Sequence, residues 1–149
     1  QKTYQLGQVE IQAVPGSPVG PTLVENGYII KGLESGKNIY YEPHGYHSDS
    51  LQEAAPIDVI ITPIINLKLP LLGAVIKGQE TALQLCKQSN PQVILATAAG
   101  GDIDFKGVIT LVLKADGSVA EFNRLLEQNH LSTKAIDPQS GEIIELSLV

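Results

Sequence analysis

Apolar and polar residues alternate along the first third of the chain, a pattern typical of half-buried β-strands. The segment 9–14 (VEIQAV) places its apolar side chains on one face of such a strand. The segment 23–32 (LVENGYIIKG) predicts a second strand with a bulge or tight turn at Glu-Asn-Gly, and 32–41 (GLESGKNIYY) predicts a third after a turn at ESGK. Between the first two strands, 15–21 (PGSPVGP) is expected to interrupt regular structure, because prolines remove amide donors.

Longer apolar runs follow, and they predict strands that are covered on both faces. The segment 57–65 (IDVIITPII) is almost continuous in β-branched residues, and 92–102 and 108–117 are similar. A loop is expected at 67–73 (LKLPLLG). The tail 133–149 is expected to form a closing hairpin around PQSG.

Three segments have the periodicity or the capping signals of helices. They are 50–55, 78–91 and 120–130. Ser50 and Ser118 each precede a glutamate by three residues, which is the spacing of a capping box. Strands and helices are thus interleaved, so the sequence predicts an α/β (α+β) fold in which helices cover a β-sheet.

Composition and charge narrow the classes of partner. The chain has 149 residues, 43% of them hydrophobic and 17% charged, which predicts a single folded domain spanning residues 1–149. Its net charge of −6 argues against nucleic acid as a partner, because phosphate binding depends on clustered Lys and Arg. Charged and polar residues and two prolines interrupt the apolar stretch 57–76, so we expect a buried core segment and no association with a membrane.

Two further features concern the origin of the chain. Cys86 is the only cysteine, so an internal disulfide is excluded and a cytoplasmic location is expected. The sequence starts at Gln1 and contains no methionine, which predicts a processed chain or a fragment.

Candidate chemistry is concentrated in the loop that follows the third predicted strand. The loop carries Glu42, His44 and His47, and carboxylate and imidazole groups are ligands for zinc, iron or manganese. Asp102 or Asp104, after a later strand, are candidates for a further ligand. The alternative is structural: loop histidines are commonly solvated or bonded to the backbone, and aspartates commonly cap turns.

Other reactive residue types give weaker signals. Ser17 has no nucleophile-elbow pattern around it. Cys86 falls on the inner face of a predicted helix, which favours a core thiol. No catalytic residue is assigned from the sequence.

The order of these motifs resembles the carboxyl-terminal half of the metallo-β-lactamase fold, and in particular lactonase-like metal-dependent hydrolases. The resemblance runs over VEIQAVPGSP, NGYIIKGLESGKNIYYEPHGYH, IDVIITPI and PQVILATAAGG. It implies half of an αββα sandwich. It also implies a hydrolase of esters, lactones or phosphoesters that uses zinc or another divalent metal, with Glu42, His44, His47 and Asp102 as the candidate metal ligands.

The sequence departs from the family pattern at the ligand positions. Residues 16–18 stand where the first histidine is expected, 42–46 where Gly-Asp-Thr-Gly-Tyr is expected, and 97–99 where the last histidine is expected. The His-x-His-x-Asp-His motif of the other half does not occur in the chain. Two hypotheses therefore stay open: the C-terminal part of a metal-dependent hydrolase, or a degenerate, non-catalytic binding module without metal. Half a sandwich exposes apolar sheet, so the expected partner is the complementary N-terminal half or another copy of the chain, beside any small-molecule substrate.

Overall fold

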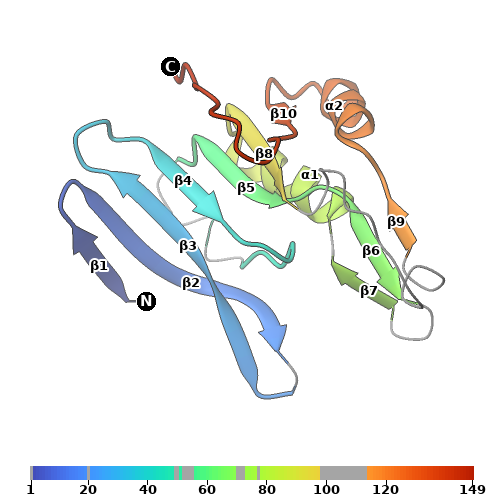
Figure 1. Cartoon of the computed structure of the whole chain (residues 1–149), viewed down its shortest axis with the longest axis horizontal. Helices are drawn as coiled ribbons and strands as arrows, with labels where there is room; N and C mark the ends of the chain where they lie inside the picture. The colour runs from blue at the N-terminus through green and yellow to red at the C-terminus, as the bar shows by residue number, and fades with distance from the viewer. Residues whose placement is uncertain are drawn as a thin grey trace.

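The computed structural model describes residues 2–19, 21–48, 51, 56–69, 73–76, 78–97 and 114–149 (Figure 1). Seven strands form one mixed sheet in the order β1-β2-β3-β4-β5-β8-β10, and β7-β6-β9 form a smaller sheet. The helices are α1 (Gln79–Ser89) and α2 (Val119–Gln128). The strands are β1 (Thr3–Leu6), β2 (Val9–Val19), β3 (Leu23–Gly32), β4 (Asn38–Tyr41), β5 (Val59–Pro63), β6 (Asn66–Leu69), β7 (Gly73–Ile76), β8 (Val93–Thr97), β9 (Lys114–Asp116) and β10 (Lys134–Ile136).

The directions of the strands bring several carboxyl ends to one edge of the large sheet. Antiparallel pairs join β1 to β2, β2 to β3 and β3 to β4, whereas β4, β5, β8 and β10 pair in parallel. Hence β2, β4, β5, β8 and β10 all run in the same direction. The α/β fold class predicted from the sequence is confirmed.

One face of the sheet forms the hydrophobic core. The row Ile29, Tyr40, Ile60, Ile94 and Ala135 crosses neighbouring strands in register, and every member is buried. The inner residues of the two helices, which are Ala82, Leu85, Cys86, Phe122 and Leu126, belong to the same cluster. The two helices therefore cover this face, as the interleaved sequence pattern predicts.

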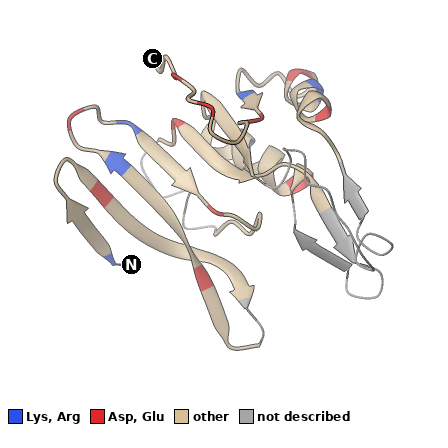
Figure 2. Cartoon of the chain, in the orientation of Figure 1, with Lys and Arg blue, Asp and Glu red and all other residues tan. Residues whose placement is uncertain are grey.

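The opposite face of the sheet is also apolar, but it is less covered. The row Ala13, Tyr28, Tyr41, Ile61, Leu95 and Ile136 is half-buried or exposed along its whole length. Tyr4 and Leu6 of β1 lie on this face and are 67% and 64% exposed. Figure 2 shows no charged residue in the bodies of β4, β5 and β8. In β4, β5 and β8 the sheet thus has two apolar faces, and the helices cover one of them.

β2 continues through the proline-rich segment, which corrects the expected interruption at 15–21. Two residues of β2, Gly16 and Ser17, lie opposite Glu25 alone, because the register shifts between Pro15 and Pro18. This bulge accommodates an extra residue within a continuous pair of strands. A Cβ atom at Gly16 would lie 2.8 Å from the backbone nitrogen of Gly27, so glycine permits the close approach of the two strands.

Two further expectations need correction. Residues 67–69 of the predicted loop belong to β6 and Gly73 begins β7. These two strands pair antiparallel, so the segment is in part a hairpin. The tail forms a turn, in which Glu142 N–H donates to Gln139 O at 3.0 Å, but no strand follows it within residues 142–149. Instead, β10 pairs in parallel with β8. A hairpin requires a second strand, whereas here the apolar residues before the turn add to an existing sheet edge.

The helix predictions succeed where the structure describes them. Ser118 Oγ accepts a hydrogen bond from Glu121 N–H at 3.2 Å and caps α2, as the capping-box spacing predicts. α1 follows Gly78, whose backbone is close to Ile65. The helix predicted at 50–55 lies outside the described residues, apart from Leu51. Neither of the two described helices has the length and apolar character that crossing a membrane requires.

Candidate functional site

The loop 42–48 begins at the carboxyl end of β4, near the middle of the large sheet. Glu42 continues the strand direction, because its N–H donates to Ile61 O at 3.1 Å and its carbonyl accepts from Thr62 Oγ1 at 2.8 Å. Both contacts fasten the start of the loop to β5. In α/β folds, binding sites commonly occur at this edge of the sheet, beyond the carboxyl ends of the strands.

Glu42 is completely buried, and its two carboxylate oxygens have different surroundings. Oε2 accepts hydrogen bonds from the backbone N–H groups of His44 at 3.1 Å and Tyr46 at 2.8 Å. Oε1 is buried and has no hydrogen-bond partner among the described residues. Burial raises the pKa of the Glu42 carboxyl, and the backbone hydrogen bonds oppose that rise. One oxygen therefore shapes the loop, while the other is left to interact with something else.

His44 lies between two carboxylates. Its Nδ1 is 3.0 Å from Glu25 Oε2 and 4.0 Å from Glu42 Oε1. Glu25 comes from β3, opposite the β2 bulge, and its side chain is 48% exposed. The nearer contact is within ion-pair distance, although Nδ1 is buried and makes no hydrogen bond among the described residues. The imidazole thus lies between the loop and β3.

His47 contacts the core rather than the two carboxylates. Its Nδ1 is 3.3 Å from the hydroxyl of Tyr40, and the two rings meet edge to face with centroids 5.7 Å apart. Its Nε2 is buried without a hydrogen-bond partner in the described part of the chain. Burial lowers the pKa of His47 to about 4, so the ring is neutral near pH 7. Burial also raises the pKa of Tyr40, with a smaller contribution from Glu42.

A cavity of about 420 Å³ lies beside this loop. It is lined by Pro15 and Gly16 of the β2 bulge, by residues 45–48, and by Thr81 in the first turn of α1. The structure thus places the proline-rich segment of β2 next to the loop that carries the candidate ligands. A smaller cavity of about 100 Å³ continues from His47 and Ser48 along α1 to Gln88.

The other candidates from the sequence are not part of this cluster. Asp102 and Asp104 lie outside the described residues. Ser17 is buried in β2, and its hydroxyl lies 3.5 Å from Pro18 O. Cys86 is buried in the core, and burial raises the pKa of its thiol to about 12, which agrees with the predicted core position.

Two members of the cluster were not found by sequence reasoning. Glu25 was read as part of a turn signal, and Tyr40 as an ordinary strand residue. Strand register supplies the missing information: Tyr40 pairs with Ile29 on the core face, and Glu25 lies opposite the bulge. Alternation along residues 38–41 indicates that Tyr40 faces the core, but not that its hydroxyl meets an imidazole seven residues later.

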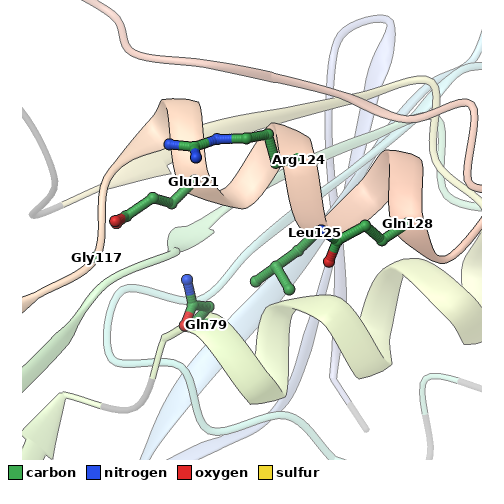
Figure 3. A pocket seen from close by; sticks show the side chains of 6 residues that line it. All are labelled: Gln79, Gly117, Glu121, Arg124, Leu125 and Gln128. Carbon is green, nitrogen blue, oxygen red and sulfur yellow. The ribbon is translucent and has the colours of Figure 1, made fainter.

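A separate cavity of about 320 Å³ lies between the helices, and Figure 3 shows its lining. Glu121, Arg124, Leu125 and Gln128 come from α2, and Gln79 begins α1. Most of these side chains are exposed. None of them belongs to the Glu42 cluster.

Comparison with known proteins agrees with this geometry. A family model described as "Beta-lactamase superfamily domain" matches residues 1–98. The chain therefore belongs to this β-lactamase superfamily. No curated protein matches it.

Two solved structures share the fold. One is a candidate Zn-dependent hydrolase of the metallo-β-lactamase superfamily from Thermotoga maritima, with a TM-score of 0.58 and 17% identity over 93% of this chain and 69% of that one. The other is isothiocyanate hydrolase from Delia radicum gut bacteria, with a TM-score of 0.63 and 15% identity over 99% of this chain. The chain spans only 58% of the length of that hydrolase. At these identities the likeness establishes the fold, and the resemblance to metallo-β-lactamases is confirmed.

The family implies a metal. The described side chains could supply one metal ligand, but they do not form a complete metal site. Glu42 Oε1 is a buried carboxylate oxygen without a partner among the described residues, which suits a hard or borderline cation. No group of three or more His, Cys, Asp or Glu side chains in the described ranges is arranged to hold a metal ion. Structural and catalytic zinc sites use three or four protein ligands. These residues alone therefore do not complete a metal site.

Proposed function

We propose that the chain is the C-terminal part of a metallo-β-lactamase-like hydrolase that acts on an ester, a lactone or a phosphoester. In this proposal Glu42 contributes one carboxylate oxygen to a divalent metal, with zinc as the first choice, and the remaining ligands come from outside the described residues. The single observation that carries it is Glu42 Oε1 at the carboxyl end of β4, which is buried and has no hydrogen-bond partner among the described residues.

The proposed reaction is hydrolysis, in which water cleaves a bond of the substrate. In an ester or lactone, the water oxygen bonds to the acyl carbon and the bond to the alkoxy oxygen breaks. One water proton passes to the leaving alkoxide, and the product is an acid with an alcohol, or a hydroxy acid. When bound, a divalent metal would polarise the substrate and lower the pKa of water. Within this chain, Glu42 holds its position through two backbone hydrogen bonds, and neither depends on the metal.

The less covered sheet face supports the proposal that a complementary half is missing. Tyr4, Leu6 and Tyr28 are exposed on this face, which carries apolar residues on each strand from β1 to β8. Soluble proteins rarely leave a continuous apolar surface of this kind uncovered. An N-terminal half that covers this face would also stand next to the edge where Glu42 lies.

The second candidate is a non-catalytic binding module of the same fold. It is favoured by the contacts of the two histidines: His44 Nδ1 lies 3.0 Å from Glu25 Oε2, and His47 Nδ1 lies 3.3 Å from the Tyr40 hydroxyl. Both contacts brace the loop without any metal. In this alternative, Glu42 serves only to shape the turn through its Oε2.

Metal content separates the two candidates. Protein purified from its own source without chelator is expected to contain a stoichiometric divalent metal, and its intact mass should exceed 15.9 kDa if the second half is covalently attached. Glu42→Gln should lose most of the metal, because an amide is a weaker ligand, while its oxygen still accepts the backbone hydrogen bonds. Glu127→Gln, an exposed change on α2, is the matched control and should retain the metal. A metal-free native protein would reject the hydrolase and favour the binding module.

A further inference from the structure

The tail after β10 turns back and returns along β8 to the amino edge of the large sheet. Ile136, the last residue of β10, is in register with Leu95 of β8. The backbone of Val149 is hydrogen-bonded to Gln92, the residue directly before β8. Residues 137–149 therefore run in the direction opposite to β8 (Figure 1).

The last part of the tail has one covered side. From residue 143 onwards, half-buried and exposed residues alternate: Ile144, Leu146 and Leu148 are half-buried, and Ile143 is 89% exposed. A period of two is typical of an extended segment that lies with one side against the protein. No residue of 142–149 belongs to a strand. The segment thus lies on the molecule without extending the hydrogen-bond ladder of the sheet.

The tail lies on the less covered face of the sheet. The helices already cover the core face, where Ile94 of β8 and Ala135 of β10 are buried. In Figure 1 the tail crosses in front of β8, whereas α1 lies behind the sheet. On this front face Leu95 and Ile61 are half-buried, whereas Leu6 of β1 is 64% exposed. The cover that the tail provides is therefore limited to the β8 end of the face.

Two side chains clamp the end of the tail. Gln92 Oε1 accepts from Val149 N–H at 2.8 Å, and Gln92 Nε2 donates to Val149 O at 2.9 Å. Lys37 Nζ also donates to Val149 O. Asp58 Oδ1 orients both side chains, because it accepts from Gln92 Nε2 at 3.0 Å and from Lys37 Nζ at 3.3 Å. The clamp therefore comes from residues next to the starts of β4, β5 and β8, and these bonds go to the backbone of the tail.

We infer that residues 143–149 are a strap that shields the β8 end of the less covered face, and that opening the Lys37–Gln92 clamp exposes this area for contact with a second copy of the chain. The strap is outside the ladder, so it opens locally while the sheet stays folded. The area beneath it continues the face on which Leu6 and Tyr28 are exposed, so opening enlarges one continuous surface.

The first test removes the clamp in the full chain treated with chelator. Gln92→Ala deletes both hydrogen bonds to Val149, and a net loss of one hydrogen bond raises the open fraction roughly fivefold. Exchange of the Val149 amide, followed by NMR, should then be about fivefold faster. Self-association in sedimentation equilibrium should be about fivefold tighter, because the apparent Kd falls as the competent fraction rises. Gln128→Ala, at an exposed position on α2, is the control.

A second variant opens the strap without changing the sheet, since Gln92 also contacts Asp58. Leu146→Ser removes a half-buried side chain from the inner side of the strap, and it should tighten association at least about fivefold. Ile143→Ser makes a similar change on the outer side of the same segment, where the side chain is 89% exposed. This matched control should leave association unchanged.

Several results would overturn the inference. Unchanged Val149 exchange in Gln92→Ala would show that the clamp does not hold the tail. Faster exchange without tighter association, or variants that stay monomeric at high concentration, would show that the strap covers no contact surface. Equal effects of Leu146→Ser and Ile143→Ser would contradict its two-sided character. Each measurement is made without metal, so the outcome is separate from that of the hydrolase proposal.

Discussion

Glu42 is held in an environment that favours its protonated form. The carboxyl group is fully buried, its pKa is raised by desolvation, and Oε1 lacks a partner among the described residues. A group with a raised folded-state pKa binds more protons in the folded than in the unfolded state. Its stabilising effect is therefore present at low pH and is lost as pH rises through the folded-state pKa.

This loss of stability with rising pH gives a prediction for Glu42→Gln in chelator-treated protein. The amide cannot ionise, so the variant should gain stability over the wild type as pH rises above the ordinary carboxyl pKa, by about 1 kcal/mol, the scale of one unsatisfied buried group. Urea unfolding at several pH values measures the difference. Parallel stability curves for the two proteins would show that the Glu42 carboxylate is already compensated.

His47 should have the opposite pH dependence. Its pKa falls to about 4, so the unfolded chain binds more protons between about pH 4 and 6.5, and stability should rise with pH in that window. His47→Gln should remove roughly 1–3 kcal/mol of this pH-dependent change in the free energy of unfolding. His130→Gln, at an exposed position after α2, is the control. An unaltered pH slope in His47→Gln would show that the imidazole is not kept neutral by burial.

The limits of sequence reasoning at this scale follow from what a local pattern contains. Residue types and the position after a strand indicated Glu42, His44 and His47. The partners Glu25 and Tyr40 depend on strand register and on a bulge, which are tertiary features. Sequence spacing placed His44 and His47 together as ligands. In the structure their Nδ1 atoms meet different partners, one on β3 and one in the core.

At the scale of elements, the junction before α1 depends on a glycine. A Cβ atom at Gly78 would lie 1.9 Å from Ile65 O, a backbone atom that cannot move aside alone. Gly78→Ala should therefore destabilise the chain by roughly 2–4 kcal/mol, as expected when a close backbone approach is overpacked. Thermal unfolding measures the loss, and Lys87→Ala on the exposed side of α1 is the control. A near-neutral Gly78→Ala would contradict the close approach.

The predicted elements differ in how strongly local sequence specified them. β5, β8, α1 and α2 were predicted because long periodic runs and caps act within one segment. The tail hairpin was wrong, since β10 gains more by joining β8 in the buried sheet than by pairing locally. β2 continues through its prolines, which have no N–H donor, because a bulge interrupts the hydrogen-bond ladder there and accommodates the extra residue. The secondary structure of loop and edge segments depends on the strands beside them, and a local sequence pattern carries no information about those strands.

At the scale of the whole molecule, the two faces of β1–β3 have opposite character. Thr3 and Gln5 point to the side where the helices lie, whereas Tyr4 and Leu6 point to the less covered face, in register with Ile11 and Val9. In most antiparallel sheets the face that meets water is polar. Here the less covered face of β1–β3 is the apolar one. The apolar face is therefore expected to be an interface.

The chain alone should consequently self-associate through this face when the proposed partner half is absent. In sedimentation velocity at high concentration, species heavier than 15.9 kDa are expected. The double variant Leu6→Lys and Tyr28→Lys should shift the distribution to monomer, because both side chains are exposed and the new charges oppose burial of the face. The double variant Thr3→Lys and Gln5→Lys adds the same charge to the opposite face, so it should leave association unchanged. A monodisperse wild-type monomer would mean that this face is stable in water, and the case for a missing half would lose its structural support.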